Sequence, residues 1–456
     1  MNHNERVISV LDTGAVAGVE ALQTEAFQRA LDEIFLAGGG RVTVPAGDFN
    51  IGSLRIRSNT TLHLQAGARL FGSRDPEDYY ALQNDTLQPL PEEYRDHMPP
   101  PTVRGQHNQP LSPDPGGRRY NALFRAFDAE NISIVCDEGS MIDGRDVYDD
   151  LGEEGYRGPL GFSMHFVKNV TFSGLDIYNT GNWAILVKNG SNLTFENVRI
   201  SGGHDGIDVF GCDNVVIRDC EFFTGDDCVA GYGDVNVTIS NCLMNSSCSA
   251  LRFGGTNVFI RDCRFEGPGK YCFRNSLTLE EKINGVDPAL EHRHNMLSVF
   301  TYFAMESDLI KEIPDNIVIR NCTVENVDRF IHYNFSGNER WQGGLPLRGL
   351  VMENIKATGI LLPVTVYGRA DLPLNLTLRD VEIFFRPTDV PHAFMHAAHC
   401  ESIVMKNVRV DNPNANAFIK SWGGLGKVEL DGVTSNSPDG ETVVDADEPF
   451  VCRRIC

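Results

Sequence analysis

Three aspartates in two neighbouring segments have the types and spacing of a catalytic carboxylate cluster. Asp205 lies in HDGIDVFG, whereas Asp226 and Asp227 follow each other in TGDDCVAG. Carboxylates that are crowded together repel one another and lose hydration, so that one holds a proton while another stays ionised. A general acid beside a general base requires that difference. Two other interpretations stay open, because turn aspartates often bond to the backbone and because clustered carboxylates suit a calcium ion.

A repeated nine-residue phrase brings these aspartates to equivalent positions. The phrase starts with Asn and alternates apolar and polar residues, and a period of two is typical of a strand. Asp205 comes 13 residues after Asn192, and Asp227 comes 13 residues after Asn214. The clearest copies of the phrase begin at Asn169, Asn192, Asn214, Asn236, Asn257 and Asn316.

The spacing of these copies predicts the fold. Successive central copies lie 23, 22, 22 and 21 residues apart, which is the length of one solenoid turn, here called a coil, made of several short strands. Coils stack by strand pairing at about 4.8 Å, so equivalent residues form columns in which the turn asparagines can bond to one another. We predict an all-β fold, a parallel β-helix, as a single domain over residues 1–456.

Three segments depart from the repeat. Apolar residues at helical spacing predict a helix within 19–40, with Thr24 as its N-cap, that covers the open N-terminal end of the solenoid. Residues 75–120 are rich in proline and charge, and the interval between the last two clear copies is 59 residues. We therefore predict two long loop insertions, at 75–120 and at 275–312.

Four of the twelve cysteines occupy one position of the repeat, where a small apolar side chain is wanted. These are Cys220, Cys242, Cys263 and Cys322. We interpret them as buried, reduced core residues, with disulfides as the alternative. Pairs with the Cys-x-x-Cys spacing of a structural zinc site are absent from the sequence.

Composition limits the partners. The chain has 456 residues, and its 40 Lys and Arg against 62 Asp and Glu give a formal charge of −22. Nucleic acid and anionic membrane surfaces are therefore disfavoured as partners. No apolar stretch approaches the ~18 residues that cross a bilayer, and the first residues lack the pattern of a secretory signal, so we expect a cytoplasmic protein.

The aspartate motifs resemble those of glycoside hydrolase family 28, the polygalacturonase family. The segments 38–73, 179–200, 204–217 and 225–233 resemble the family in order and spacing. The resemblance implies a right-handed parallel β-helix and inverting hydrolysis of a glycosidic bond. It implies that Asp226 is the general acid and that Asp205 and Asp227 activate water, without a metal or other cofactor.

The match fails where the family binds its substrate. The histidine of the family's Gly-His-Gly motif falls on Ser249, and the Arg-x-Lys pair that contacts the substrate carboxylate falls on Phe273–Asn275, around Arg274. The acid and base chemistry can persist in such a divergent member, whereas recognition of an internal galacturonate comes into question.

Other residues can take over substrate binding. Arg252 suits a bidentate contact with a uronate carboxylate, although a surface ion pair is the alternative. The remaining candidates follow the columns of the repeat, and with Ser249, Arg252 and Arg274 they complete the predicted set: Asn182, Lys270, Arg329 and His332. Trp183 fits core packing as well as sugar stacking.

These observations favour an exo-acting inverting glycoside hydrolase that trims pectin-derived or related plant-glycan oligosaccharides, with galacturonate, rhamnose or a neutral sugar at the cleavage point. One alternative is a β-helix polysaccharide lyase or uronate epimerase. Another is a glycan-binding β-helix without catalysis. The predicted partner is an oligosaccharide; a homo-oligomer stays open, because no interface can be identified in the sequence.

Overall fold

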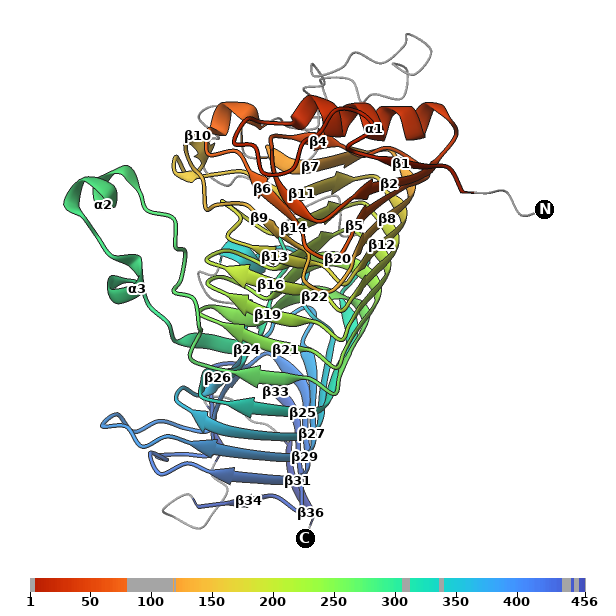
Figure 1. Cartoon of the computed structure of the whole chain (residues 1–456). Coiled ribbons are helices and arrows are strands. Elements are labelled where there is room, and N and C mark those ends of the chain that lie inside the picture. Colours follow the sequence, from red (N-terminus) through yellow and green to blue (C-terminus); the bar gives the residue numbers. More distant parts are fainter. Residues whose placement is uncertain are drawn as a thin grey trace. The chain divides into compact units, whose positions relative to one another are not determined.

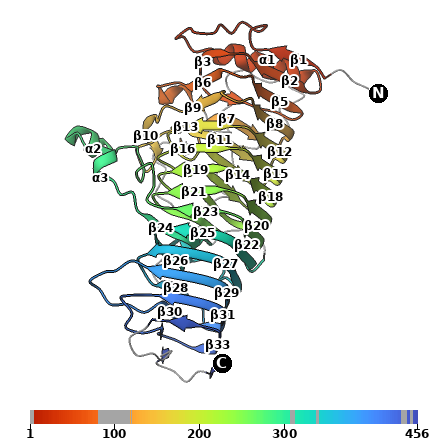
Figure 2. The ribbon, with the colours of Figure 1, turned by 60° about the horizontal axis from the view of Figure 1, so that its bottom comes forward.

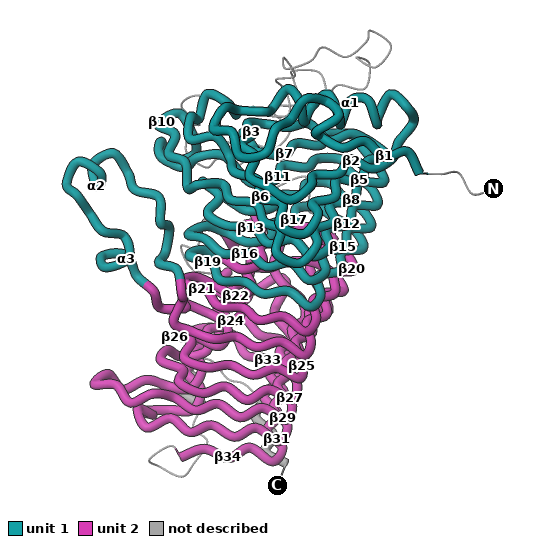
Figure 3. The backbone as a smooth tube through the Cα atoms, viewed as in Figure 1, with its two compact units in different colours: residues 1–226, 271–293 teal, residues 227–270, 294–456 magenta. Residues whose placement is uncertain are grey.

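A computed structural model describes residues 5–79, 118, 120–305, 312–335, 340–436, 444–446 and 451–455. Contacts divide the chain into two compact units (Figure 3), unit 1 with residues 1–226 and 271–293 and unit 2 with residues 227–270 and 294–456. The single domain over 1–456 stays a prediction. Within the described ranges, no helix is long and apolar enough to span a membrane.

Unit 1 consists of short parallel strands that stack in three columns (Figures 1 and 2). One column runs β7, β11, β14, β17, the next β8, β12, β15, β18, and the third β9, β13, β16, β19. The strands of unit 1 are β1 Val7–Ser9, β2 Gly40–Val44, β3 Gly47–Ile51, β4 Leu54–Arg55, β5 Thr60–Leu64, β6 Ala68–Gly72, β7 Ala122–Phe127, β8 Glu130–Cys136, β9 Met141–Asp143, β10 Tyr148–Glu153, β11 Leu160–His165, β12 Lys168–Ser173, β13 Asp176–Tyr178, β14 Ile185–Lys188, β15 Ser191–Glu196, β16 Arg199–Gly202, β17 Ile207–Phe210, β18 Asp213–Arg218 and β19 Glu221–Thr224. Its helices are α1 Thr24–Leu36, the 3-10 turn η1 Pro76–Asp78, α2 Leu279–Asn284 and α3 Pro288–Glu291.

Unit 2 is built from the same kind of coil, with longer strands, because several of its strands run through two columns. Its elements are β20 Val229–Ser240, β21 Leu243–Ser246, β22 Ser249–Arg261, β23 Arg264–Glu266, β24 Met296–Tyr302, β25 Asp315–Glu325, β26 Val327–Asn334, η4 Arg340–Gln342, β27 Gly349–Ile360, β28 Val364–Tyr367, β29 Leu374–Phe385, β30 Met395–Ala398, β31 Cys400–Asp411, β32 Ile419–Ser421, β33 Leu425–Asp431, β34 Thr434–Ser435, β35 Val444–Ala446 and β36 Val451–Ile455. The parallel β-helix that the repeat predicts is therefore present in both units.

The alternation in the repeated phrase separates the core from the surface. In unit 1, Val170 pairs in register with Leu193, and Leu193 with Val215, and all three are buried. Phe172 and Phe195 stack on successive coils at 5.2 Å between ring centroids. Because every second residue of each strand points inward, the repeat fills each coil with apolar side chains.

The asparagines of the phrase form the predicted ladders. In unit 1, Asn192 donates to Asn169 at 3.0 Å, and in unit 2 Asn316 donates to Asn257 at 2.9 Å. These residues have φ near +55°, the left-handed conformation that Asn tolerates better than most residues. One side chain therefore both permits the turn and links it to the next coil.

The four repeat cysteines are buried and are in no disulfide, as predicted. Each thiol lies within hydrogen-bond distance of the carbonyl oxygen two residues earlier, for example Cys220 with Arg218 at 3.1 Å and Cys322 with Arg320 at 3.1 Å. A small side chain with a weak donor fits this turn.

The segments that depart from the repeat differ in detail from their predictions. Helix α1 lies within 19–40, but the prediction of Thr24 as its N-cap is wrong, because Thr24 is the first helical residue and Gln23 is the N-cap. The Thr24 hydroxyl instead accepts a bond from Gly52 N at 2.7 Å. Most of 75–120 lies outside the described residues. Within 275–312, α2 and α3 form the extra segment, whereas β24 is a coil strand that pairs with β22 and β26.

Candidate active site

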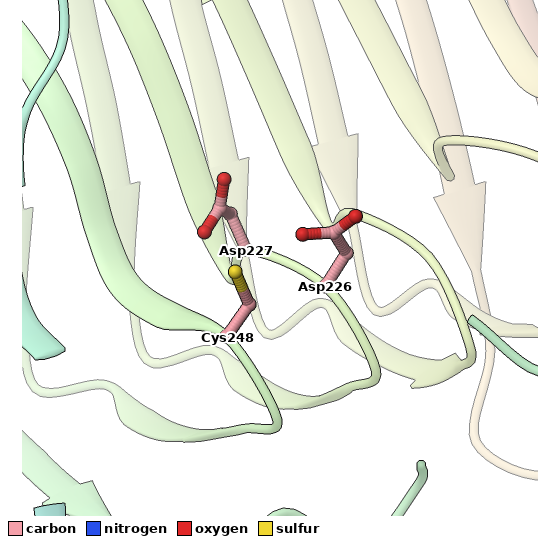
Figure 4. A group of neighbouring side chains, drawn as sticks. All are labelled: Asp226, Asp227 and Cys248. Carbon is pink, nitrogen blue, oxygen red and sulfur yellow. The ribbon is translucent and has the colours of Figure 1, made fainter. Parts of the chain in front are cut away.

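The three predicted catalytic aspartates are all buried, with exposures of 8% for Asp205, 5% for Asp226 and 2% for Asp227. Asp205 lies between β16 and β17, and Asp226 follows β19. Asp226 and Asp227 are consecutive (Figure 4), and unit 1 ends its first segment at Asp226 while unit 2 begins at Asp227. Asp226 therefore belongs to unit 1 and Asp227 to unit 2, and the contacts of each are described within its own unit.

Two arginines of unit 1 hold Asp226. Arg274 Nε lies 3.2 Å from Asp226 Oδ2, and Arg157 Nη2 lies 3.9 Å from the same oxygen. Arg274 Nη1 also donates to Glu154 Oε2 at 2.8 Å and to the Tyr156 hydroxyl at 3.0 Å. Arg157 Nε donates to Glu154 Oε2 at 3.1 Å, so Glu154 joins both cations.

These charges stabilise one another, although the side chains of Arg274 and Glu154 are 27% and 35% exposed. Burial alone lowers the pKa of Arg274, but the carboxylates of Asp226 and Glu154 outweigh it and raise that pKa. Burial raises the pKa of Glu154, but the charges of Arg157 and Arg274 bring it below its ordinary value. Both arginines and Glu154 therefore stay charged near neutral pH, and they set a fixed electrostatic field around Asp226.

Two glycines allow Arg274 to reach Asp226. Arg274 N donates to Gly203 O at 3.0 Å, so the segment after Tyr271 runs directly over the turn that carries Asp205. A Cβ on Gly203 would lie 2.3 Å from Asn275 N, and a Cβ on Gly225 would lie 2.1 Å from Cys272 O. Glycine is therefore required at both positions by close backbone approach.

Asn182 and the unpredicted His204 support this cluster. Asn182 is 1% exposed, receives a bond from Arg157 at 3.1 Å and donates to Glu153 at 2.9 Å, so it orients Arg157. His204 Nε2 lies 2.6 Å from Ser276 Oγ. Burial, Arg157 and Arg274 hold the pKa of His204 well below its usual range, so this imidazole is neutral.

In unit 2, Asp227 is held by the coil that follows it. Ser249 N donates to Asp227 Oδ1 at 3.0 Å, and Arg252 Nη1 donates to Asp227 Oδ2 at 3.2 Å. The Arg252 guanidinium lies 5.0 Å from the Phe303 ring centroid and 4.9 Å from that of Trp341. Such cation–π contacts fix the direction of the arginine, so Asp227 has a cation of its own.

Cys248 lies next to Asp227, with its Sγ within 4.8 Å of a carboxylate oxygen (Figure 4). A thiol and a carboxylate are metal ligands. Arg252 bonds to the same carboxylate, however, and its positive charge opposes a second cation there. The contacts of unit 2 therefore favour an arginine–aspartate pair over a metal site at Asp227.

The remaining residues that were predicted to bind substrate lie in several different environments. Ser249 is buried and its hydroxyl donates to Thr301 at 3.3 Å. Lys270 is exposed, and its backbone N–H donates to Asn245. Arg329 and His332 lie on β26. Burial, with the charges of Arg329 and Arg252, lowers the pKa of His332 to about 4, so His332 lies near both arginines and is neutral at pH 7.

Trp183, which fits either core packing or sugar stacking, is 8% exposed and packs edge-on against Phe210 at 6.1 Å. It is therefore a core residue of unit 1.

Comparison with known proteins supports the fold and the resemblance. Residues 158–283 match the family model described as "Right handed beta helix region". A probable polygalacturonase of Vitis vinifera is 28% identical over 234 residues, which are 49% of this chain and 43% of that protein. A polygalacturonase of Brassica napus is 29% identical over 282 residues, 56% of this chain and 62% of that protein. The chain thus spans less than two thirds of either relative.

Among solved structures, the exopolygalacturonase of Thermotoga maritima superposes with a TM-score of 0.62 at 20% identity, covering 89% of this chain and 91% of that one. At this identity the likeness concerns the fold, a right-handed parallel β-helix. The resemblance to the polygalacturonase family that the aspartate motifs predict is confirmed by these relatives.

Proposed function

We propose that the protein is an inverting, exo-acting glycoside hydrolase whose substrate is a pectin-derived oligosaccharide with a uronate at the cleavage point. One observation carries the proposal: the consecutive, buried residues Asp226 and Asp227 are each paired with a different arginine. Catalytic carboxylates require distinct surroundings if one is to donate a proton while another accepts one.

In the proposed reaction, Asp226 gives its proton to the glycosidic oxygen as the bond to the anomeric carbon breaks. Asp205 and Asp227 accept a proton from a water molecule that attacks the opposite face of the sugar. An inverting pair needs about 6.5–9.5 Å between its carboxyl groups to admit this water. The product then carries the new hydroxyl on the face opposite to the bond that was cleaved.

Arg274 supplies a way to couple substrate binding to proton transfer. In the free protein its contact with Asp226 favours the ionised carboxylate. A uronate that binds the Arg274 guanidinium in bidentate fashion competes for this contact, and protonation of Asp226 then becomes easier. An acidic substrate thus prepares its own general acid, which a neutral analogue cannot do.

The cysteines from Cys136 to Cys400 are all buried and are in no disulfide, which supports the further proposal of a reducing, cytoplasmic location. There the substrate would be an imported oligosaccharide and not a polymer. Relatives named exopolygalacturonases, such as that of Cochliobolus carbonum, support removal of sugars from a chain end.

The proposal is tested by incubating the purified protein with pectin-derived oligosaccharides, with and without a chelator, and resolving products by mass and ultraviolet absorbance. We expect a saturated monosaccharide in both conditions, with proton NMR revealing the inverted anomer first. An unsaturated product would identify a lyase instead. Binding of these oligosaccharides without any product would contradict hydrolysis.

A further inference from the structure

A column of polar residues follows the outer surface of unit 2 along successive coils. Arg252 pairs in register with Thr301, Thr301 with His332, and His332 with Thr365. Thr365 pairs with His396, and His396 with Lys420. Five steps of about 4.8 Å separate Arg252 from Lys420, so the column begins at the arginine of Asp227 and extends well beyond it.

The column faces outward because its strand neighbours face inward. Ile331 and Tyr333 flank His332, and both are fully buried. Met395 and Ala397, on either side of His396, are fully buried as well. Side chains alternate between the two faces of a strand, so the side chain of His396 lies on the outside of the coil.

Two aromatic rings lie beside the far part of this column. Trp422 is 54% exposed, and its ring centroid is 4.7 Å from that of His396 and 5.8 Å from that of Tyr367. Trp422 N donates to Ala397 O at 3.2 Å, and the neighbouring Ser421 hydroxyl donates to Gly423 O at 2.7 Å. The backbone at Trp422 is therefore held by hydrogen bonds, and its exposed indole packs edge-on against the two neighbouring rings.

Positive charge gathers at the same place. Burial, with the charges of Lys420, His392 and Arg329, lowers the pKa of His396 to about 4, and Arg329 also acts on Tyr367. Arg329 and Lys420 thus lie near the two aromatic rings. In a chain with a formal charge of −22, a local group of cations is needed to hold an anionic ligand against the overall repulsion.

We propose that Arg329, Tyr367, His396, Lys420 and Trp422, here called the distal strip, bind an acidic oligosaccharide chain at sugar units remote from the cleaved bond. The cations bind uronate carboxylates and the Trp422 face stacks on a sugar ring, while neutral His396 offers a hydrogen bond. The inference rests on the proposed function for its substrate class. A chain that lies along the column reaches from Arg252 to the strip within unit 2 alone.

The test compares long and short acidic oligosaccharides in strip variants and matched controls. Lys420→Gln and Trp422→Ala change the strip, whereas Lys406→Gln and Phe259→Ala change an exposed lysine and an exposed aromatic residue on other strands, β31 and β22. Affinity for galacturonate oligomers is measured by calorimetry in an Asp226→Asn background, and kcat/KM is measured in the otherwise native protein. Equal thermal midpoints verify folding.

We expect each strip variant to bind a long oligomer about tenfold more weakly, ~1.4 kcal/mol, and to bind a disaccharide normally, while both controls match the parent. Raised salt should reduce the effect of Lys420→Gln. Unchanged affinity for the long oligomer in both strip variants would overturn the proposal.

The two proposals fail in distinguishable ways. If oligomer binding depends on the distal strip but the native protein shows no turnover, the binding proposal stands and the proposed hydrolase function is contradicted. If the native protein turns over substrate but the strip variants match it at every chain length, the proposed hydrolase function stands and the binding proposal is contradicted.

Discussion

Arg274 and Asp226 are 48 positions apart in the chain, yet Arg274 Nε lies 3.2 Å from Asp226 Oδ2. The contact puts a cation from the segment that precedes α2 onto the carboxylate that we propose as the general acid. Because the same guanidinium holds Glu154 and Tyr156, it is fixed by three partners. Asp226 is therefore set in a charged surrounding before substrate binds.

Removing the Arg274 cation should shift the pH dependence of the reaction. In Arg274→Gln, Asp226 is protonated more readily because a positive neighbour is lost, so we expect the basic-side fall of kcat/KM to move to higher pH. KM for an acidic substrate should rise at the same time. Arg293→Gln is the matched control, since the guanidinium groups of Arg274 and Arg293 lie 4.7 Å and 3.8 Å from the centroid of the Phe273 ring. An unmoved profile in Arg274→Gln would separate this arginine from the acid.

Gly203→Ala should displace Arg274 from a distance. The added methyl group would lie 2.3 Å from Asn275 N, and overpacking of this kind costs about 1–3 kcal/mol. We expect a lower free energy of unfolding in urea and reduced turnover. Gly202→Ala, whose nearest neighbour would be 3.3 Å away, should have a much smaller effect. Equal effects of the two substitutions would contradict the steric account.

Arg252→Ala should weaken the binding of an acidic substrate more than that of its neutral analogue, by about tenfold or ~1.4 kcal/mol. The substitution removes the cation that contacts Asp227 and lies over the Phe303 and Trp341 rings. Inhibition constants for a uronate and the corresponding neutral sugar measure the difference. Equal losses would count against recognition of a carboxylate by Arg252.

His332 should make the protein less stable as the pH falls. Its folded pKa is lowered to about 4 by burial, Arg329 and Arg252, whereas an unfolded histidine titrates near 6.5. The unfolded state therefore binds more protons between these values, and stability is lost as pH falls from ~6.5 to ~4. Urea unfolding at pH 7 and pH 5 should show a smaller loss in His332→Gln; an identical loss would contradict this assignment.

The regular coils were predictable, because they follow from local rules in the sequence. The phrase around Asn192 repeats its alternation, so strand positions, core columns and asparagine ladders recur with it. The Cys220 position required only a small apolar residue. Asp205 and Asp227 share one repeat position, which predicted that they occupy equivalent places on their coils.

The contacts made by inserted segments were not predictable from the repeat. Arg274 lies in the interval where the regular spacing of the repeat is interrupted, so the repeat does not predict its position. Its position relative to Asp226 depends on the backbone path over Gly203. Glu154 and Arg157 also lie outside the copies of the repeated phrase, so the repeat does not predict their contacts. The Gly-Gly pair before Asp205 was a signal of close backbone approach, although it did not reveal which segment approaches.

The most direct test of the account compares the native protein with Asp226→Asn on a pectin-derived oligosaccharide that the native protein cleaves. We predict that kcat falls by about 10²–10⁴, while the thermal midpoint and the oligosaccharide affinity stay close to native. Near-native turnover in Asp226→Asn would remove this carboxylate from the mechanism and contradict its proposed role as the general acid.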